Sequence, residues 1–216
     1  MDKKCFKAAF FDMDGIVVDS MPYHFISWFE ALRPYDVRVS QLLVFEMEGA
    51  KWDEVIGLAF KHAGKPSLPQ ETIDEIRQKR SEIFKNCLRT FVFTGIPEFV
   101  KALKSQGVLV GLVTGSSLKE AQNLLPKAFY SLFDTIVAGD MVEKAKPDPE
   151  PYLTAAKNLN IATKDCVVVE NAPYGIKAAK AAGMFCCAVA TSLSKDYLSQ
   201  ADEKFDTHED LYKYFK

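Results

Sequence analysis

Two aspartates close an apolar run near the start of the chain. Asp12 and Asp14 follow the stretch KAAFF (7–11), and Gly15 comes directly after them. Residues two apart in an extended segment point the same way, so both carboxylates can serve one reaction centre. One carboxylate can attack phosphorus as a nucleophile, while the other acts as general acid and base. Gly15 lets the chain turn sharply after them because it has no Cβ.

Polar residues also follow three later apolar runs. They are Thr114, Gly115 and Ser116 after VLVGLV (108–113), Lys146 in the loop after TIVA (135–138), and Glu170 and Asn171 at the end of CVVVE (166–170). Several carboxylates in one place repel each other unless a cation lies among them, and hard oxygen ligands select Mg²⁺. A lysine, a hydroxyl and nearby backbone N–H groups can hold phosphate oxygens. Together these residue types indicate metal-assisted phosphoryl transfer.

The elements that must position these groups alternate between strand and helix. The expected strands are the short apolar runs 7–11, 108–113, 135–138, 166–170 and 185–190, and the expected helices between them are 97–106, 117–130, 148–159 and 173–182. Short apolar runs without alternation are typical of strands covered on both faces. The pattern predicts an α/β fold with a doubly wound parallel sheet. In such sheets, ligands bind beyond the carboxyl ends of the strands, where the polar groups lie.

One section interrupts this alternation. Between Asp19 and about Phe91 there is no strong strand pattern, and the periodic stretches 23–32, 52–64 and 70–88 look helical. The simplest account is an all-helical insertion after the first strand. We therefore expect a core domain of residues 1–17 and 92–216 and a helical cap domain of residues 18–91. The hinges would be short, near 17–22 and 89–95.

Composition gives no support to several classes of function. Of 216 residues, 48% are apolar and 26% charged, and the net charge of −2 gives no reason to expect a nucleic-acid or anionic-membrane partner. The five cysteines show no CxxC or zinc spacing, which favours buried, reduced thiols. No segment approaches the roughly 20 apolar residues of a membrane span or resembles a signal peptide. We expect a cytoplasmic protein, monomeric by default.

Four segments resemble the haloacid dehalogenase superfamily, in its β-phosphoglucomutase-like branch with a helical cap after the first strand. They are DMDGIVVDS (12–20), LVTGSS (112–117), KAKPDPEPY (144–152) and VVENAPYGIKAAKAAG (168–183), in this order along the chain. The resemblance implies that Asp12 is the nucleophile and Asp14 the acid/base, and that an acid at position 14 favours phosphoryl transfer over C–Cl or C–P cleavage.

The same resemblance assigns the phosphate and metal groups. Thr114 would bind the transferring phosphoryl group with the backbone of Gly115 and Ser116, and Lys146 would neutralise charge on the nucleophile and the phosphate. Asp12, the backbone carbonyl of Asp14, Glu170 and Asn171 would hold Mg²⁺. The family often has an aspartate where this chain has Asn171, which offers a carbonyl oxygen but no charge. Asn171 is either a weaker metal ligand, with Glu170 sharing the metal, or only a loop hydrogen-bonding residue.

The cap carries four further candidates for substrate binding. His24, four residues before Trp28, resembles the mutase histidine that hydrogen-bonds the acid/base; the alternative is a histidine packed at a helix start, and we expect Trp28 in the core. Lys79 and Arg80 lie where the family places a substrate-facing cation, or they form an ordinary solvated face. EMEGAKWDE (46–54) keeps a glycine, Gly49, but lacks the mutase arginine for the distal phosphate, and Lys51 is its nearest basic residue.

These patterns favour a Mg²⁺-dependent phosphotransferase of small phosphorylated metabolites, foremost a sugar-phosphate phosphatase that uses water as acceptor. The missing cap arginine argues against the close alternative, a β-phosphoglucomutase, because a bisphosphate that turns round needs a basic partner at both ends. A binding module that keeps the fold without turnover is opposed by the intact set Asp12, Asp14, Thr114 and Lys146. A nucleotide-binding Rossmann protein is disfavoured because no GxGxxG follows the first strand.

Overall fold

A six-stranded, wholly parallel sheet forms the centre of the molecule. The computed structural model describes residues 6–89 and 91–216. In that part of the chain the strands are β1 (Ala8–Phe11), β2 (Leu109–Val113), β3 (Thr135–Val137), β4 (Cys166–Glu170), β5 (Phe185–Val189) and β6 (Glu203–Phe205), in the order β3-β2-β1-β4-β5-β6. Phe11, the last residue of β1, pairs with Leu112 of β2 and Val169 of β4. The carboxyl ends of these three strands therefore lie side by side.

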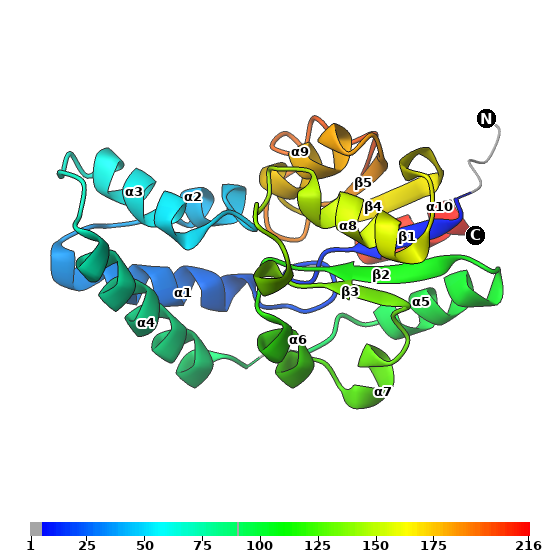
Figure 1. Cartoon of the computed structure of the whole chain (residues 1–216), viewed down its shortest axis with the longest axis horizontal. Helices are drawn as coiled ribbons and strands as arrows, with labels where there is room; N and C mark the ends of the chain where they lie inside the picture. The colour runs from blue at the N-terminus through cyan, green and yellow to red at the C-terminus, as the bar shows by residue number, and fades with distance from the viewer. Residues whose placement is uncertain (1–5, 90) are drawn as a thin grey trace.

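Helices cover both faces of the sheet (Figure 1). α8 (Glu150–Leu159) and α9 (Pro173–Ala181) pack on one face, and α5 (Ile96–Ser105) and α10 (His208–Phe215) pack on the other, with α6 (Leu118–Leu124) and α7 (Lys127–Tyr130) following β2. Successive residues of β1 point to opposite faces: Ala8 and Phe10 join the core under α8 and α9, whereas Ala9 and Phe11 join the core under α5 and α10. Burial on both faces explains why the strand carries no alternation of polar residues.

Among the described residues, α-helices are the main regular elements between β1 and the segment that leads to α5. They are α1 (Met21–Leu32), α2 (Gln41–Glu46), α3 (Trp52–His62) and α4 (Gln70–Cys87), which form the blue-to-teal group at the left of Figure 1. α1 packs along α4. The buried residues of α4 are Ile76, Arg80 and Phe84, which lie four apart on one helical face. Arg80 thus occupies a position where the spacing calls for an apolar side chain.

Two segments that lie side by side connect the helical group to the sheet. The amide of Asp19 donates to the carbonyl of Phe91 at 3.1 Å, and the amide of Phe93 donates to the carbonyl of Val17 at 3.0 Å. An antiparallel bridge joins Val18 to Val92 between them. The chain therefore leaves the sheet and returns to it at one place, as an insertion requires.

The predicted α/β class with a helical insertion is confirmed, but one local prediction was wrong and two short elements were missed. Residues 117–130 do not form one helix: Pro126 lies between α6 and α7, where its ring and its missing N–H end the first helix. β6 and α2 were not predicted, because EKF (203–205) is short and polar and because QLLVFE (41–46) is only six residues long. The other predicted strands and helices agree with the structure within a few residues.

The structure also shows the state of the cysteines and whether any described helix could cross a membrane. Cys87, Cys166 and Cys186 are free thiols; Cys166, Cys186 and Cys187 are buried and Cys87 is partly buried, while Cys5 lies outside the described residues. Within those residues, none of the helices combines the length and the apolar character that crossing a bilayer requires.

Candidate active site

Asp12, Lys146 and Glu170 form a buried charged cluster beyond the ends of β1 and β4. The Nζ of Lys146 lies 2.6 Å from Asp12 Oδ1 and 2.7 Å from Glu170 Oε1. All three residues are at most 5% exposed. The amide of Asp12 donates to the carbonyl of Val169 at 3.0 Å, which fixes this residue at the junction of the two strands. One cation therefore holds two carboxylates that would otherwise repel each other.

Burial and pairing set the charge states of this cluster. Burial raises the pKa of the Asp12 carboxyl well above its usual range, although the Lys146 ammonium opposes this. Burial also disfavours the charge on Lys146, but the carboxylates of Asp12 and Glu170 outweigh that effect and raise its pKa. Lys146 thus remains a cation at neutral pH and can neutralise negative charge at Asp12.

Glu170 accepts hydrogen bonds from protein donors at both oxygens. Its Oε1 accepts from Lys146 and from the Tyr152 hydroxyl at 2.7 Å, while its Oε2 accepts from the amides of Asn171 at 2.9 Å and Ala172 at 3.3 Å. A Cβ on Gly175 would lie 1.7 Å from Oε1, so only glycine leaves room for this carboxylate. In this arrangement Glu170 anchors Lys146 and offers little room for the predicted metal contact.

Asp14 lies beside Asp12 in the sequence but has different partners. Its Oδ1 accepts from Ser20 Oγ at 2.5 Å and lies 3.1 Å from His24 Nε2, and its Oδ2 accepts from Ser116 Oγ at 3.4 Å. Burial alone would raise the pKa of the Asp14 carboxyl, but His24 and Ser20 outweigh it and lower that pKa. The two aspartates therefore have opposite pKa shifts because their partners differ: burial dominates at Asp12, whereas His24 and Ser20 outweigh burial at Asp14.

His24 is held between Asp14 and a buried arginine. Arg80 Nη2 lies 2.6 Å from His24 Nδ1. A guanidinium can only donate, so Nδ1 is the acceptor and Nε2 carries the proton that is donated to Asp14. The Arg80 guanidinium in turn lies over the rings of Trp52, Phe84 and Trp28, at 4.5, 4.6 and 5.3 Å. Arg80 thus faces the interior of the helical group, and Trp28 is buried as predicted.

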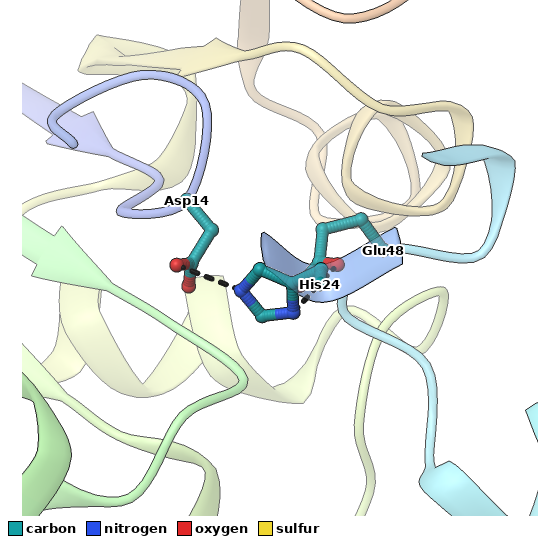
Figure 2. Close-up of side chains that lie close together, drawn as sticks. All are labelled: Asp14, His24 and Glu48. Carbon is teal, nitrogen blue, oxygen red and sulfur yellow. Dashed lines mark hydrogen bonds and ion pairs between the residues drawn. The ribbon is translucent and has the colours of Figure 1, made fainter. Parts of the chain in front are cut away.

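Glu48 completes this group from the loop between α2 and α3 (Figure 2). Its Oε2 lies 3.6 Å from His24 Nδ1, and one ligand atom each of Asp14, His24 and Glu48 lie within 4.8 Å of one another. Although such a set can hold a metal, the two carboxylates face opposite nitrogens of one imidazole, and Arg80 shares the Nδ1 side. One ion cannot bind both nitrogens of the ring, so we interpret Arg80, His24 and Asp14 as a hydrogen-bonded chain, with the Glu48 carboxylate beside it.

The loop after β2 lies next to Asp14. Thr114 is buried, its amide donates to the carbonyl of Val137 at 2.9 Å, and the amide of Ser116 donates to Thr114 Oγ1 at 3.0 Å. A Cβ on Gly139 would lie 2.2 Å from the carbonyl oxygen of Gly115, so a glycine there permits this close packing. Ser116 Oγ reaches Asp14, whereas Gly115 is exposed. The loop presents a hydroxyl and backbone groups at the edge of the sheet that carries the aspartates.

Two buried oxygens have no hydrogen-bond donor in the part of the chain that the structure describes: Asp12 Oδ2 and Asn171 Oδ1. The Nδ2 of Asn171 donates to Ser192 Oγ at 3.2 Å. A Cβ on Gly15 would lie 2.1 Å from this Nδ2. Unpaired buried oxygens are unfavourable unless a ligand satisfies them. Because both are hard acceptors beyond neighbouring strand ends, these two residues fit a divalent cation such as Mg²⁺.

The predicted cap residues divide into two groups. His24 and Arg80 belong to the buried network, whereas Lys51 and Lys79 are exposed, and Lys79 makes only an i,i+3 ion pair with Glu82 at 4.0 Å among the contacts of the described residues. Sequence reasoning missed Ser20, Glu48 and Tyr152, although all three lie inside segments that it used. The four-residue spacing of Ile76, Arg80 and Phe84 was the signal that Arg80 points inward.

Comparison with known proteins gives one consistent result. The family model described as haloacid dehalogenase-like hydrolase matches residues 9–189. A β-phosphoglucomutase of Bacillus subtilis is 29% identical over 189 residues, which cover 85% of this chain and 83% of the relative. A fructose-1-phosphate phosphatase of Escherichia coli is 30% identical, covering 81% of this chain and 91% of the relative. A solved structure of a candidate β-phosphoglucomutase from Bacteroides vulgatus is 31% identical, with a TM-score of 0.88, covering 99% of this chain and 89% of that one.

Proposed function

Since the chain belongs to the haloacid dehalogenase-like hydrolase family, and is a phosphatase or a closely related phosphomutase of it, we propose that it hydrolyses the phosphate esters of small sugars. The observation that carries the proposal is the buried pair of Asp12 and Lys146 at 2.6 Å, beside Asp14. A carboxylate that is poised for attack and a cation that neutralises it suit phosphoryl transfer.

In the proposed reaction, a carboxylate oxygen of Asp12 attacks phosphorus and the ester P–O bond breaks. The phosphoryl group is then carried as an aspartyl phosphate, which water hydrolyses to regenerate Asp12 and release inorganic phosphate. Lys146 neutralises the charge on Asp12 and the phosphoryl oxygens, while Thr114 and the backbone of Gly115 and Ser116 bind those oxygens.

Asp14 is the proposed acid and base. It gives a proton to the leaving oxygen in the first step and removes a proton from water in the second. Its lowered pKa keeps the Asp14 carboxyl ionised at neutral pH, so that it can accept a proton from water. The acid role requires a protonated Asp14, and a phosphoryl group bound nearby raises the pKa of a carboxyl by charge repulsion. Ser20 and His24 hold the carboxylate in position for both steps.

We propose that Mg²⁺ binds between Asp12 and Asn171, with the backbone carbonyl of Asp14 as a third ligand. The unpaired oxygens Asp12 Oδ2 and Asn171 Oδ1 support this assignment. When bound, the cation supplies positive charge that offsets the negative charge of the phosphate. Glu170 contributes through Lys146 and through its hydrogen bonds to the amides beside Asn171.

Sugar phosphates are the proposed substrates because relatives that act on them match most of this chain. The Escherichia coli fructose-1-phosphate phosphatase is one. The likeness to a β-phosphoglucomutase from Bacillus subtilis favours a second candidate, a phosphomutase. The cap argues against it, because Lys51 and Lys79 are exposed and the loop between α2 and α3 presents the carboxylate of Glu48. A phosphatase needs to bind only one phosphate.

The remaining features of the proposal concern the protein as a whole. We propose that residues 18–91 act as a cap that closes over residues 1–17 and 92–216, so that bulk water is excluded during the first step. The paired segments at Val18 and Val92 are suited to be the hinge. The free thiols of Cys87, Cys166 and Cys186 support a reducing compartment such as the cytoplasm. We propose a monomer with no nucleic-acid or membrane partner.

A screen for phosphate release over sugar phosphates, with and without Mg²⁺, tests the proposed function. We expect release from several hexose and pentose phosphates, and its loss when Mg²⁺ is removed with a chelator and its recovery when Mg²⁺ is restored. β-Glucose 1-phosphate with a bisphosphate primer separates the two candidates. Formation of glucose 6-phosphate without free phosphate would establish the mutase and exclude the phosphatase.

A further inference from the structure

We propose that Glu48 determines which leaving groups the enzyme accepts. In this proposal its carboxylate selects phosphate monoesters whose leaving group carries hydroxyls close to the ester oxygen, and it disfavours those with a second anion there. The inference rests on the proposed phosphatase function and adds to it a specificity residue in a cap that lacks the expected basic groups.

The loop that carries Glu48 lies against the phosphate-handling groups. A Cβ on Gly49, the next residue, would lie 2.7 Å from Cδ of Lys146, and a Cβ on Gly115 would lie 3.3 Å from Cα of Gly49. The cap loop is therefore in contact with the lysine and with the loop that follows β2. A substrate bound by those groups has Glu48 directly beside it.

The position of the leaving group follows from the role proposed for Asp14. The ester oxygen must lie within hydrogen-bond reach of Asp14 to receive its proton. Asp14, His24 and Glu48 have ligand atoms within 4.8 Å of one another, and the Glu48 side chain is 16% exposed, whereas His24 is 6% exposed. The atoms attached to the ester oxygen thus come within reach of the partly exposed Glu48 carboxylate.

The surrounding charges leave Glu48 as the group that a substrate meets. Arg80 donates to His24 and lies over three aromatic rings; its charge offsets part of the charge on Glu48, but its guanidinium is buried and closed to a substrate. Lys146 is bound by Asp12 and Glu170, whereas Lys51 and Lys79 are exposed. Among the residues that the structure describes, the cap therefore offers an acceptor here rather than a free cation. A carboxylate accepts hydrogen bonds from hydroxyls and repels anions at short range.

The test uses two esters that differ at one group. Glycerol 3-phosphate carries a CH₂OH where 3-phosphoglycerate carries a carboxylate. For the wild type and for Glu48→Gln, kcat/KM is measured for each ester, or its inhibition constant against the best sugar phosphate if it is not turned over. We expect the wild type to prefer glycerol 3-phosphate, and Glu48→Gln to reduce that preference by about tenfold or more, because glutamine keeps the size but removes the charge.

The preference ratio separates specificity from damage to the fold, because inactive protein lowers both values equally. Glu46→Gln is the matched control: it removes the same charge two residues away, at the partly buried end of α2, and should leave the ratio unchanged. An unchanged ratio in Glu48→Gln, or an equal loss on both esters, would overturn the proposal while leaving the phosphatase intact. Failure of the wild type to release phosphate from every ester in the screen would instead overturn the proposed function, and this inference with it.

Discussion

Arg80 Nη2 lies 2.6 Å from Nδ1 of His24, although 56 residues separate them. This contact joins α4 to α1 and fixes the imidazole so that its Nε2 proton points at Asp14, 3.1 Å away. The helical segment is thereby connected to a predicted catalytic carboxylate through one ring. Arg80 and His24 both lie in the segment 18–91, so a cap that moved away from the sheet would carry the contact between them with it.

The first prediction concerns the positioning role of Arg80. Arg80→Lys should lower kcat by about 10- to 100-fold with a small change in KM, because the ammonium cannot match the planar guanidinium over the three aromatic rings and His24 loses its fixed tautomer. Steady-state kinetics on the best sugar phosphate measures this split. Lys79→Met, on the exposed side of α4, is the control and should be close to wild type. A rise in KM with kcat unchanged would indicate instead that Arg80 binds the substrate.

The second prediction concerns Asp12 as the nucleophile. Asp12→Asn should lower phosphate release by at least about 10³-fold, because an amide cannot form the aspartyl phosphate. Mass spectrometry of the rapidly quenched wild type should find the added phosphoryl group on the peptide that contains Asp12. Asp53→Asn, an exposed exchange on α3, is the control and should retain activity. Turnover that survives in Asp12→Asn would refute the proposed nucleophile.

The third prediction concerns Asn171 and the metal. Asn171→Asp should increase the apparent affinity for Mg²⁺ by roughly tenfold, because it adds a negative charge at an oxygen that has no donor in the structure. Calorimetric titration of Mg²⁺ gives the affinity without turnover, and titration of activity gives it under catalysis. Asn158→Asp is the control, since Asn158 is exposed on α8 and hydrogen-bonded to Thr135. If neither titration changes, Asn171 is not a direct ligand.

The fourth prediction concerns stability. Lys146→Met should lower the unfolding free energy by about 3–5 kcal/mol at pH 7, because it leaves Asp12 and Glu170 buried without their shared cation. Urea unfolding measures this difference. Lys180→Met removes an ion pair with Asp202 in which the lysine side chain is 37% exposed, and it should have an effect of about 1 kcal/mol or less. Equal losses of unfolding free energy in the two variants would show that burial does not set the contribution of an ion pair to stability.

The fifth prediction concerns pH. Burial lowers the pKa of His208, although its Nε2 lies 2.9 Å from the carbonyl oxygen of Ile16. Below the ordinary pKa of 6.5 the unfolded chain binds more protons at this residue than the folded chain, so stability should fall as pH falls from about 6.5 towards the folded pKa. His208 also begins α10, where a positive charge is unfavourable.

Unfolding free energies at several pH values between 5 and 8 check this expectation. His208→Asn should flatten the acid side of the profile relative to the wild type. His62→Asn is the matched control because His62 is exposed on α3, and its profile should follow that of the wild type. A profile of His208→Asn that coincides with the wild type would assign the acid dependence to other groups.

The positions of Asp12, Asp14, Thr114, Lys146 and Glu170 at one edge of the sheet could be predicted from the sequence alone. Apolar runs followed by polar residues mark the ends of buried strands, and parallel strands present their carboxyl ends together. The class of fold follows from the same alternation of strands and helices. The break at Pro126 was also readable, since proline ends a helix. The short strand β6 was not, because three polar residues carry too weak a pattern.

The partners of these residues were decided only by the tertiary structure. Local patterns fix which residues point into the protein, but contacts between α1, α4 and the loop that carries Glu48 depend on how the helices pack. Packing assigned Glu170 to Lys146 and Tyr152, left Asn171 Oδ1 without a donor, and turned Arg80 inward while Lys79 stayed in solvent. The sequence determined the chemistry that this protein can perform, because strand order brings its groups together. The surroundings of the site residues, and with them the substrate specificity, depend on side chains from distant segments that meet only in the folded chain.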